Sequence, residues 1–175
     1  MMIARIRYTV LLAALCAPAF AALPVVPGKD QAGMLKSSDP KLAANKKLVY
    51  DFFRVVLRGF RIEEADKYMA VDYMQHNPNA ETGMAGFKAY FNAIKPKQLP
   101  PIPATLDDLV AIQAEGDYVT LSFVKEYDDP AAKGKKYTTT WFDMLRVVNG
   151  KLVEHWDSAT KGAAGPAAAS ATKKK

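Results

Sequence analysis

The spacing of apolar residues changes once along the chain, from a helical period to strict alternation. From Asp39-Pro40, a typical N-cap and first helical position, apolar residues recur at helical spacing as far as Gly59, which predicts a first helix. An amphipathic segment at 62–69 predicts a second, shorter helix, and Thr82 precedes a third. Residues 73–77, between the last two helices, are expected to form a short strand.

Beyond a proline-rich segment, apolar and polar residues alternate, which is the pattern of half-buried strands. The expected strands cover residues 106–114, 118–126, 137–148 and 151–158. Asn149-Gly150, between the last two, is the pair that tight β-hairpins favour. Helices followed by a meander of strands predict an α+β domain, with three helices packed on one side of a strongly curved, mainly antiparallel sheet.

The two ends of the chain show neither period. Residues 1–21 combine two arginines, a short apolar run and small residues at positions 19 and 21, which is typical of a cleavable secretory signal peptide. The apolar run is shorter than the ~20 residues that span a bilayer. We therefore expect a secreted or periplasmic protein, with no membrane association in its mature form. Residues 22–38 predict a flexible linker, 39–160 the folded domain, and 161–175 a disordered, Lys-ended tail.

The positive charge of the chain lies mainly in its ends. The formal charge is +6, and removing Arg5 and Arg7 with the signal peptide leaves +4. Removing the three terminal lysines as well leaves +1, so nucleic-acid binding is not expected. Cys16, the single cysteine, lies in the predicted signal peptide, so no disulfide framework is expected either.

The last predicted hairpin brings a carboxylate among apolar residues. Trp141, Asp143 and Leu145 share one face of their strand, and His155 and Asp157 lie together on the next. A carboxylate on an apolar face is costly unless it is paired, hydrogen-bonded or protonated. Either this face is simply exposed, or it lines a pocket in which Asp143 could donate a hydrogen bond or move a proton.

The two histidines each lie beside other polar residues, in Gln75-His76-Asn77 and in His155-Trp156-Asp157. Two histidines and an aspartate could hold a metal ion, but their spacing specifies none and the chain has no helical His-x-x-x-His pair. Histidines hydrogen-bonded at a pocket rim or a strand end are the preferred interpretation. No metal or other cofactor is therefore expected.

Three segments together resemble the SnoaL-like, or polyketide cyclase-like, branch of the nuclear transport factor 2-like superfamily. They are Tyr73-Met74-Gln75-His76-Asn77-Pro78, Phe142-Asp143-Met144-Leu145-Arg146-Val147 and Asn149-Gly150-Lys151-Leu152-Val153-Glu154-His155-Trp156-Asp157. The resemblance extends over about residues 41–160. It implies a cone-shaped α+β barrel that forms a homodimer through the outer face of its sheet. The superfamily includes polyketide cyclases, ketosteroid isomerases and binding proteins without catalysis, so the fold alone does not fix the function.

The resemblance also implies roles for individual residues. Asp143 takes the position of an aspartate in the pocket of the isomerases, and the cyclases keep an acid–base aspartate in the same cavity. Asn77 falls where the isomerases have their general base, and Phe52 replaces their tyrosine, so ketosteroid isomerisation is not expected. We predict catalytic roles for Asp143 and His76. The side chains expected to contact the ligand are Gln75, Asn77, Phe53, Trp141, Leu145, His155 and Asp157.

Two functions remain open from the sequence, ahead of a purely structural role in which the aromatic residues are ordinary core. The first is an exported protein that binds a small apolar or aromatic molecule and carries out acid–base chemistry of the aldol-condensation, isomerase or lyase type. The alternative is a non-catalytic periplasmic accessory protein that binds a ligand or a partner. Export favours the alternative, because the best-known cyclases act on cytoplasmic intermediates. The sequence leaves open whether the protein is an enzyme.

Overall fold

The first long helix begins where the sequence predicts it. In the computed structural model, which describes residues 23–162, the Asp39 side chain accepts hydrogen bonds from the first backbone amides of α2 (Pro40–Phe52). The helix continues as a π-helical segment, η1 (Phe53–Arg58), and ends at Gly59 as expected. The predicted signal peptide and almost all of the predicted tail lie outside the described residues.

The second predicted helix is a 3₁₀ helix, η2 (Ile62–Lys67). Its two buried residues, Ile62 and Ala65, are three positions apart, which matches the three-residue turn of a 3₁₀ helix. The strand that follows, β1 (Met69–Gln75), starts four residues earlier than expected. The third helix, α3 (Gly83–Ala93), follows Thr82 as predicted and packs on β1 and η2.

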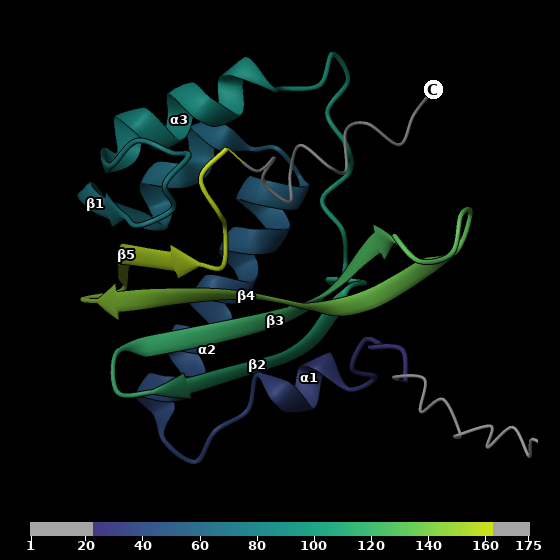
Figure 1. Cartoon of the computed structure of the whole chain (residues 1–175). Helices are drawn as coiled ribbons and strands as arrows, with labels where there is room; N and C mark the ends of the chain where they lie inside the picture. Colours follow the sequence, from purple (N-terminus) through teal and green to yellow (C-terminus); the bar gives the residue numbers. More distant parts are fainter. Residues whose placement is uncertain (1–22, 163–175) are drawn as a thin grey trace, which may run out of the picture.

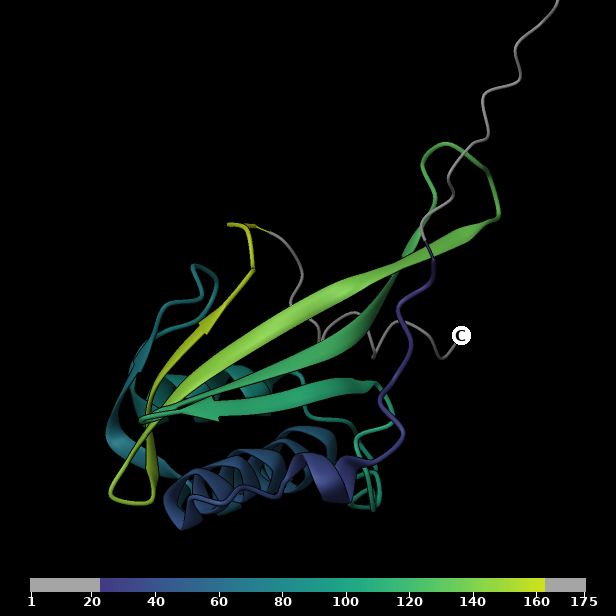
Figure 2. The same ribbon diagram turned by 90° about the horizontal axis from the view of Figure 1, so that it is seen from below.

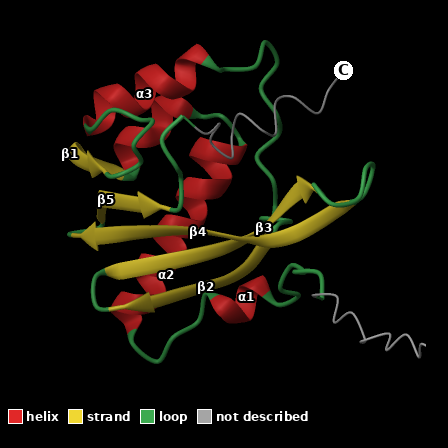
Figure 3. Cartoon of the chain, viewed as in Figure 1, coloured by secondary structure: helices red, strands yellow, loops and turns green. Residues whose placement is uncertain are grey.

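The remaining four strands form an antiparallel meander. They are β2 (Leu109–Glu115), β3 (Tyr118–Asp128), β4 (Lys136–Val148) and β5 (Lys151–Asp157), and the sheet order is β1-β5-β4-β3-β2. Only β1 runs parallel to its neighbour, β5. Asn149 and Gly150 both have positive φ, as a tight hairpin turn between β4 and β5 requires. The prediction of an α+β domain with a mainly antiparallel sheet is confirmed (Figure 3).

The core lies between α2 with η1 and one face of the curved sheet (Figure 1, Figure 2). Its centre is aliphatic, and an aromatic pair, Phe53 of η1 and Phe123 of β3, stacks at its side with ring centroids 5.3 Å apart. Strands β3 and β4 extend beyond the helices as a projecting hairpin (Figure 2). Fully buried side chains of the centre include Val49, Val56, Leu109, Leu121 and Leu152.

The segment before α2 docks on the domain, which differs from the flexible linker expected at residues 22–38. It contains a short helix, α1 (Gln31–Met34). The Gln31 amide donates to the Leu106 carbonyl (2.7 Å) and accepts from the Leu106 backbone N–H (3.1 Å) and the Tyr50 hydroxyl (2.5 Å). One side chain thus holds the segment to the loop before β2, a long-range contact that composition does not reveal. Within residues 23–162 no helix is long and apolar enough to cross a membrane.

Candidate functional site

Strands β4 and β5 bring Asp143 and His155 together on the inner face of the sheet. The antiparallel register pairs Asp143 with Asp157 and Leu145 with His155, so the two side chains lie diagonally across the pair of strands. Asp143 is 8% exposed and His155 9%. The His155 Nε2 and the Asp143 Oδ1 are 3.0 Å apart, which is a hydrogen bond in the interior of the domain.

The end of β1 supplies the second partner of His155. Parallel pairing places Gln75 beside His155, and the Gln75 Oε1 lies 2.9 Å from the His155 Nδ1. The same oxygen accepts the backbone N–H of Asn77 at 2.9 Å. A backbone N–H can only donate, so this contact identifies the Gln75 oxygen and fixes the orientation of its amide.

A fixed amide determines the roles of two neighbours. The Gln75 Oε1 can only accept, so the His155 Nδ1 must carry a proton. The Gln75 Nε2 donates to the hydroxyl of Tyr73 (3.3 Å), which is 3% exposed. Burial, together with the nearby charges of Asp143 and Asp157, raises the pKa of the Tyr73 phenol well above its usual value, so the phenol stays protonated near neutral pH.

Asn77 orients the second carboxylate of the cluster. Its Oδ1 accepts the backbone N–H of Asn79 (2.8 Å), and its Nδ2 donates to the Asp157 Oδ2 (2.6 Å). The other oxygen of Asp157 accepts the backbone N–H of Ala159 (3.0 Å). One hydrogen-bonded network therefore contains five of the predicted site residues: Gln75, Asn77, Asp143, His155 and Asp157.

Three side chains of this cluster are of types that can bind a metal ion. Ligand-type atoms of Asp143, His155 and Asp157 all lie within 4.8 Å of one another. However, Nε2 of His155 is bonded to Asp143 and Nδ1 to Gln75. A metal ion would have to replace the bond between His155 and Asp143.

His76, predicted to be catalytic with Asp143, points to the opposite side of the sheet. Its ring stacks on Trp156 with centroids 4.9 Å apart, and its Nε2 lies 2.9 Å from the Glu154 Oε1. Glu154 also accepts a hydrogen bond from Arg146 (2.7 Å) on the outer face. Alternation along β5 turns Glu154 and Trp156, the two residues that His76 contacts, to the outer face and His155 to the inner face. The histidine that contacts Asp143 is therefore His155.

The apolar residues predicted to contact a ligand belong to the packed interior. Phe53 and Leu145 are buried members of the core, and Trp141 packs against it in part. The Trp141 Nε1 is buried and has no hydrogen-bond partner among residues 23–162. Contact between these side chains and a ligand stays a prediction.

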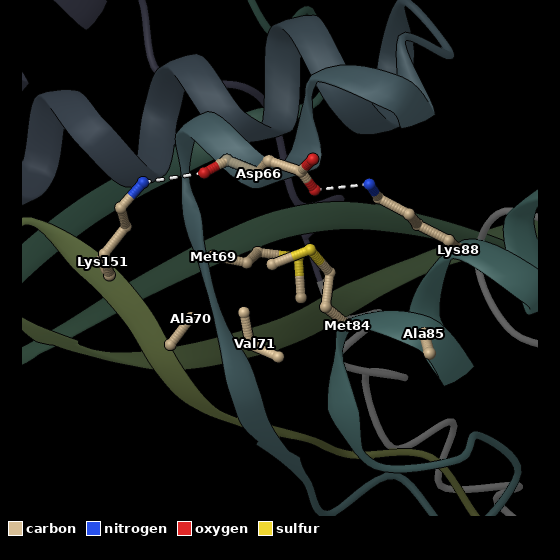
Figure 4. A pocket seen from close by; sticks show the side chains of 8 residues that line it. All are labelled: Asp66, Met69, Ala70, Val71, Met84, Ala85, Lys88 and Lys151. Atoms are coloured by element: carbon tan, nitrogen blue, oxygen red, sulfur yellow. Dashed lines mark hydrogen bonds and ion pairs between the residues drawn. The ribbon is translucent and has the colours of Figure 1, made fainter.

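An open groove of about 680 Å³ lies elsewhere, between β1, α3 and the end of η2 (Figure 4). Met69 and Met84 are among its apolar lining residues. Its two lysines already have partners: Lys88 pairs with the Asp66 carboxylate, and Lys151 donates to the Asp66 carbonyl (2.8 Å). The groove was not expected from the sequence, and Asp143 is not among the residues that line it.

Tyr73 was not among the predicted site residues. The sequence does contain a signal for it, because Tyr73 and Gln75 are two positions apart and share one side of a strand. The signal is lost when the strand is expected to begin at residue 73, where Tyr73 reads as a strand end.

Comparison with known proteins identifies the family. Residues 47–164 match the family described as SnoaL-like polyketide cyclase. A search of curated proteins found no match.

Solved structures with a similar fold come from several bacteria. A candidate polyketide cyclase from Acidithiobacillus ferrooxidans is 22% identical, with a TM-score of 0.47 over 70% of this chain and 89% of that one. TsrD from Streptomyces laurentii is 19% identical (TM-score 0.45; 70% and 90% covered), and an LEH-like epoxide hydrolase from M. tuberculosis is 12% identical (0.47; 67% and 84%). The family match extends over most of the described domain, and the chain belongs to the SnoaL-like polyketide cyclase family.

Proposed function

We propose that this protein binds a small apolar or aromatic carbonyl compound on the inner side of its sheet and moves a proton to and from it through Asp143 and His155. The observation that carries the proposal is the buried hydrogen bond between these two side chains, with the His155 ring oriented by Gln75. A pair held in this way keeps its geometry before a ligand arrives, which is what acid–base catalysis needs.

The number of protons in the pair follows from the hydrogen bonds. The His155 Nδ1 carries a proton for Gln75, so the contact between Nε2 and the Asp143 Oδ1 requires one further proton between them. That proton belongs either to an imidazolium beside a carboxylate or to a carboxylic acid beside a neutral imidazole. The pair can therefore act as a base in the first form and as an acid in the second.

Proton abstraction beside a carbonyl fits the first form. The Asp143 carboxylate takes a proton from the carbon next to the carbonyl, and the electron pair of that C–H bond moves onto the carbonyl oxygen as an enolate. The enolate carbon then attacks a second carbonyl of the same molecule, and the new alkoxide takes a proton back from the pair. This sequence is the addition stage of an aldol condensation. Isomerisation shares its proton abstraction and ends when the pair returns the proton to a different carbon of a conjugated enolate.

The alternative function is a non-catalytic accessory protein. It is supported by Asn77, an amide at the position that the isomerases use for their base, whose side chain is held by Asn79 and Asp157. Two further parts of the proposal concern location and assembly: that residues 1–21 direct export, and that the outer face of the sheet forms a homodimer. Exposed apolar side chains on that face support the second part.

Substitution of Asp143 by Asn is expected to abolish exchange while leaving binding in place. We expect 1,3-diketones and aryl ketones to raise the thermal unfolding temperature of the wild-type protein and to exchange their α-protons for deuterium in D₂O. Asp143→Asn should slow exchange by about 10²-fold or more, the usual contribution of an acid–base group. Asp72→Asn, an equal change at an exposed position of β1, should have no effect. Binding without exchange in the wild type would favour the accessory function, and no binding at all would contradict both.

The ring of His155 is expected to keep its proton on Nδ1. Nitrogen-15 NMR of the imidazoles reports which ring nitrogen is protonated, and the chain has only two histidines, so His76→Gln assigns the signals. In Gln75→Leu the acceptor for Nδ1 is lost, and the neutral ring should move its proton to Nε2, where the Asp143 carboxylate accepts it. A wild-type ring protonated on Nε2 alone would be inconsistent with the proposed pair.

Export predicts a shortened protein outside the cytoplasm. Expression of the full chain in a bacterial host should give a product in the periplasm or the medium whose N-terminal sequence begins at Ala22. A product that stays in the cytoplasm with residues 1–21 attached would contradict the proposal.

Dimerisation is expected to depend on Phe142, which is 50% exposed on the outer face. It lies two residues along β4 from Met144, which pairs with Trp156 of β5. A charge placed in the centre of an apolar interface is costly to bury, so Phe142→Lys should give monomers in sedimentation velocity. Ile102→Lys changes an exposed apolar residue in the loop before β2 and should leave the dimer intact. A monomeric wild-type protein would rule out this arrangement.

A further inference from the structure

Tyr73 is a buried hydroxyl whose own proton has no acceptor in the described part of the chain. The fixed Gln75 amide donates to the phenol oxygen, so the hydroxyl uses a lone pair there and directs its proton elsewhere. Among residues 23–162 the Tyr73 hydroxyl has no hydrogen bond beyond the one from Gln75. Buried donors are rarely left in this state, because a buried polar group without a hydrogen bond destabilises the fold.

The position of this hydroxyl links it to the acid–base pair. Tyr73 and Gln75 lie on the same side of β1, and the hydrogen bonds run without a break from Tyr73 through Gln75 and His155 to Asp143. The charges of Asp143 and Asp157 are close enough to act on the phenol. An acceptor that reached the Asp143 pair would therefore come near a donor that is already oriented.

We propose that Tyr73 donates a hydrogen bond to the carbonyl oxygen of the ligand and stabilises the negative charge that this oxygen gains when a neighbouring C–H proton is removed. This proposal rests on the proposed function and adds the residue that the chemistry still requires, a donor for the enolate oxygen. Donation from the Gln75 Nε2 to the phenol oxygen polarises the O–H bond, which strengthens its own donation.

The charges of the site also restrict the class of ligand. Asp143 and Asp157 both lie in the cluster, and a permanently anionic ligand would be repelled by two carboxylates with one imidazole to offset them. A neutral ketone meets no such repulsion, and its oxygen gains charge only as Asp143 takes up a proton. The inferred substrates are therefore neutral carbonyl compounds, and carboxylates of the same size should bind poorly.

The experiment uses two aryl probes of similar size, acetophenone labelled with ¹³C at its carbonyl and ethylbenzene, which has no acceptor. In the wild-type protein, the infrared carbonyl stretch of bound acetophenone should shift to lower frequency than in an apolar solvent. Tyr73→Phe should reverse that shift and weaken acetophenone binding by roughly 3- to 10-fold, the range for one neutral hydrogen bond. Ethylbenzene should bind both proteins equally.

A matched variant controls for the loss of a buried hydroxyl. Tyr50 is also buried, and its hydroxyl donates to Gln31 in the N-terminal part of the fold. Tyr50→Phe should leave the carbonyl frequency and both affinities unchanged, whatever it does to the unfolding temperature.

The outcomes separate this inference from the proposed function. If both probes bind and Tyr73→Phe changes neither the frequency nor the affinity, Tyr73 is not the donor, while the ligand site itself stands. If neither probe binds the wild-type protein, the ligand site fails along with the donor. Should Tyr73→Phe not fold, the wild-type spectrum alone decides, because an unshifted carbonyl band overturns the proposal.

Discussion

One backbone hydrogen bond governs the chemistry of the interior. The N–H of Asn77 binds the Gln75 oxygen, and the donor and acceptor roles of His155 and Tyr73 follow from it. The amide cannot turn over without placing its NH₂ group against a backbone N–H, where neither could accept. A proton on the Nδ1 of His155 and a hydroxyl on Tyr73 that must donate elsewhere are two consequences of this single contact. The side chains of the site thus have defined donors and acceptors before any ligand binds.

The parallel pairing of β1 with β5 makes that arrangement available. A further antiparallel strand could have joined β5 through a tight turn. Instead β1, from the helical half of the chain, runs parallel to β5, and its last residue, Gln75, pairs with His155. Its last residues alternate across the sheet, so Gln75 faces the interior and His76 the exterior. The site is therefore built from both halves of the sequence, with Asp143 and His155 from the strands and Gln75 from the helical half. This accounts for an acid–base cluster with little recognisable spacing along the chain.

The sequence predicts the helices and strands better than the long-range contacts between them. Asp39 and Pro40, the Asn149-Gly150 turn and the alternation around Asp143 each act locally, and the corresponding helix start, hairpin and inner face are all present. Long-range contacts leave no comparable pattern. Gln31 reads as part of a polar linker, yet it satisfies the backbone of residue 106.

His76 shows the same limit at the site. Alternation along a strand predicts that neighbouring residues face opposite sides of the sheet. Which residues of β1 face inward depends on its pairing with β5, and the sequence does not reveal that pairing. Gln75, His76 and Asn77 are all expected at the site, with no phase assigned to the strand. The pairing puts Gln75 and Asn77 in the network and His76 against Trp156 on the outer face.

The C-terminal end of β1, at Gln75 and His76, contacts both faces of the sheet. The pairing of β1 with β5 is irregular between Met69 and Met74, so the strand is held beside the site mainly at its tip, where the His76 N–H donates to the His155 carbonyl (3.0 Å). From this tip one side chain holds the interior imidazole, and the next stacks on the exterior indole of Trp156. If a ligand inside and a partner outside both displace this tip, each changes the binding free energy of the other by the same amount.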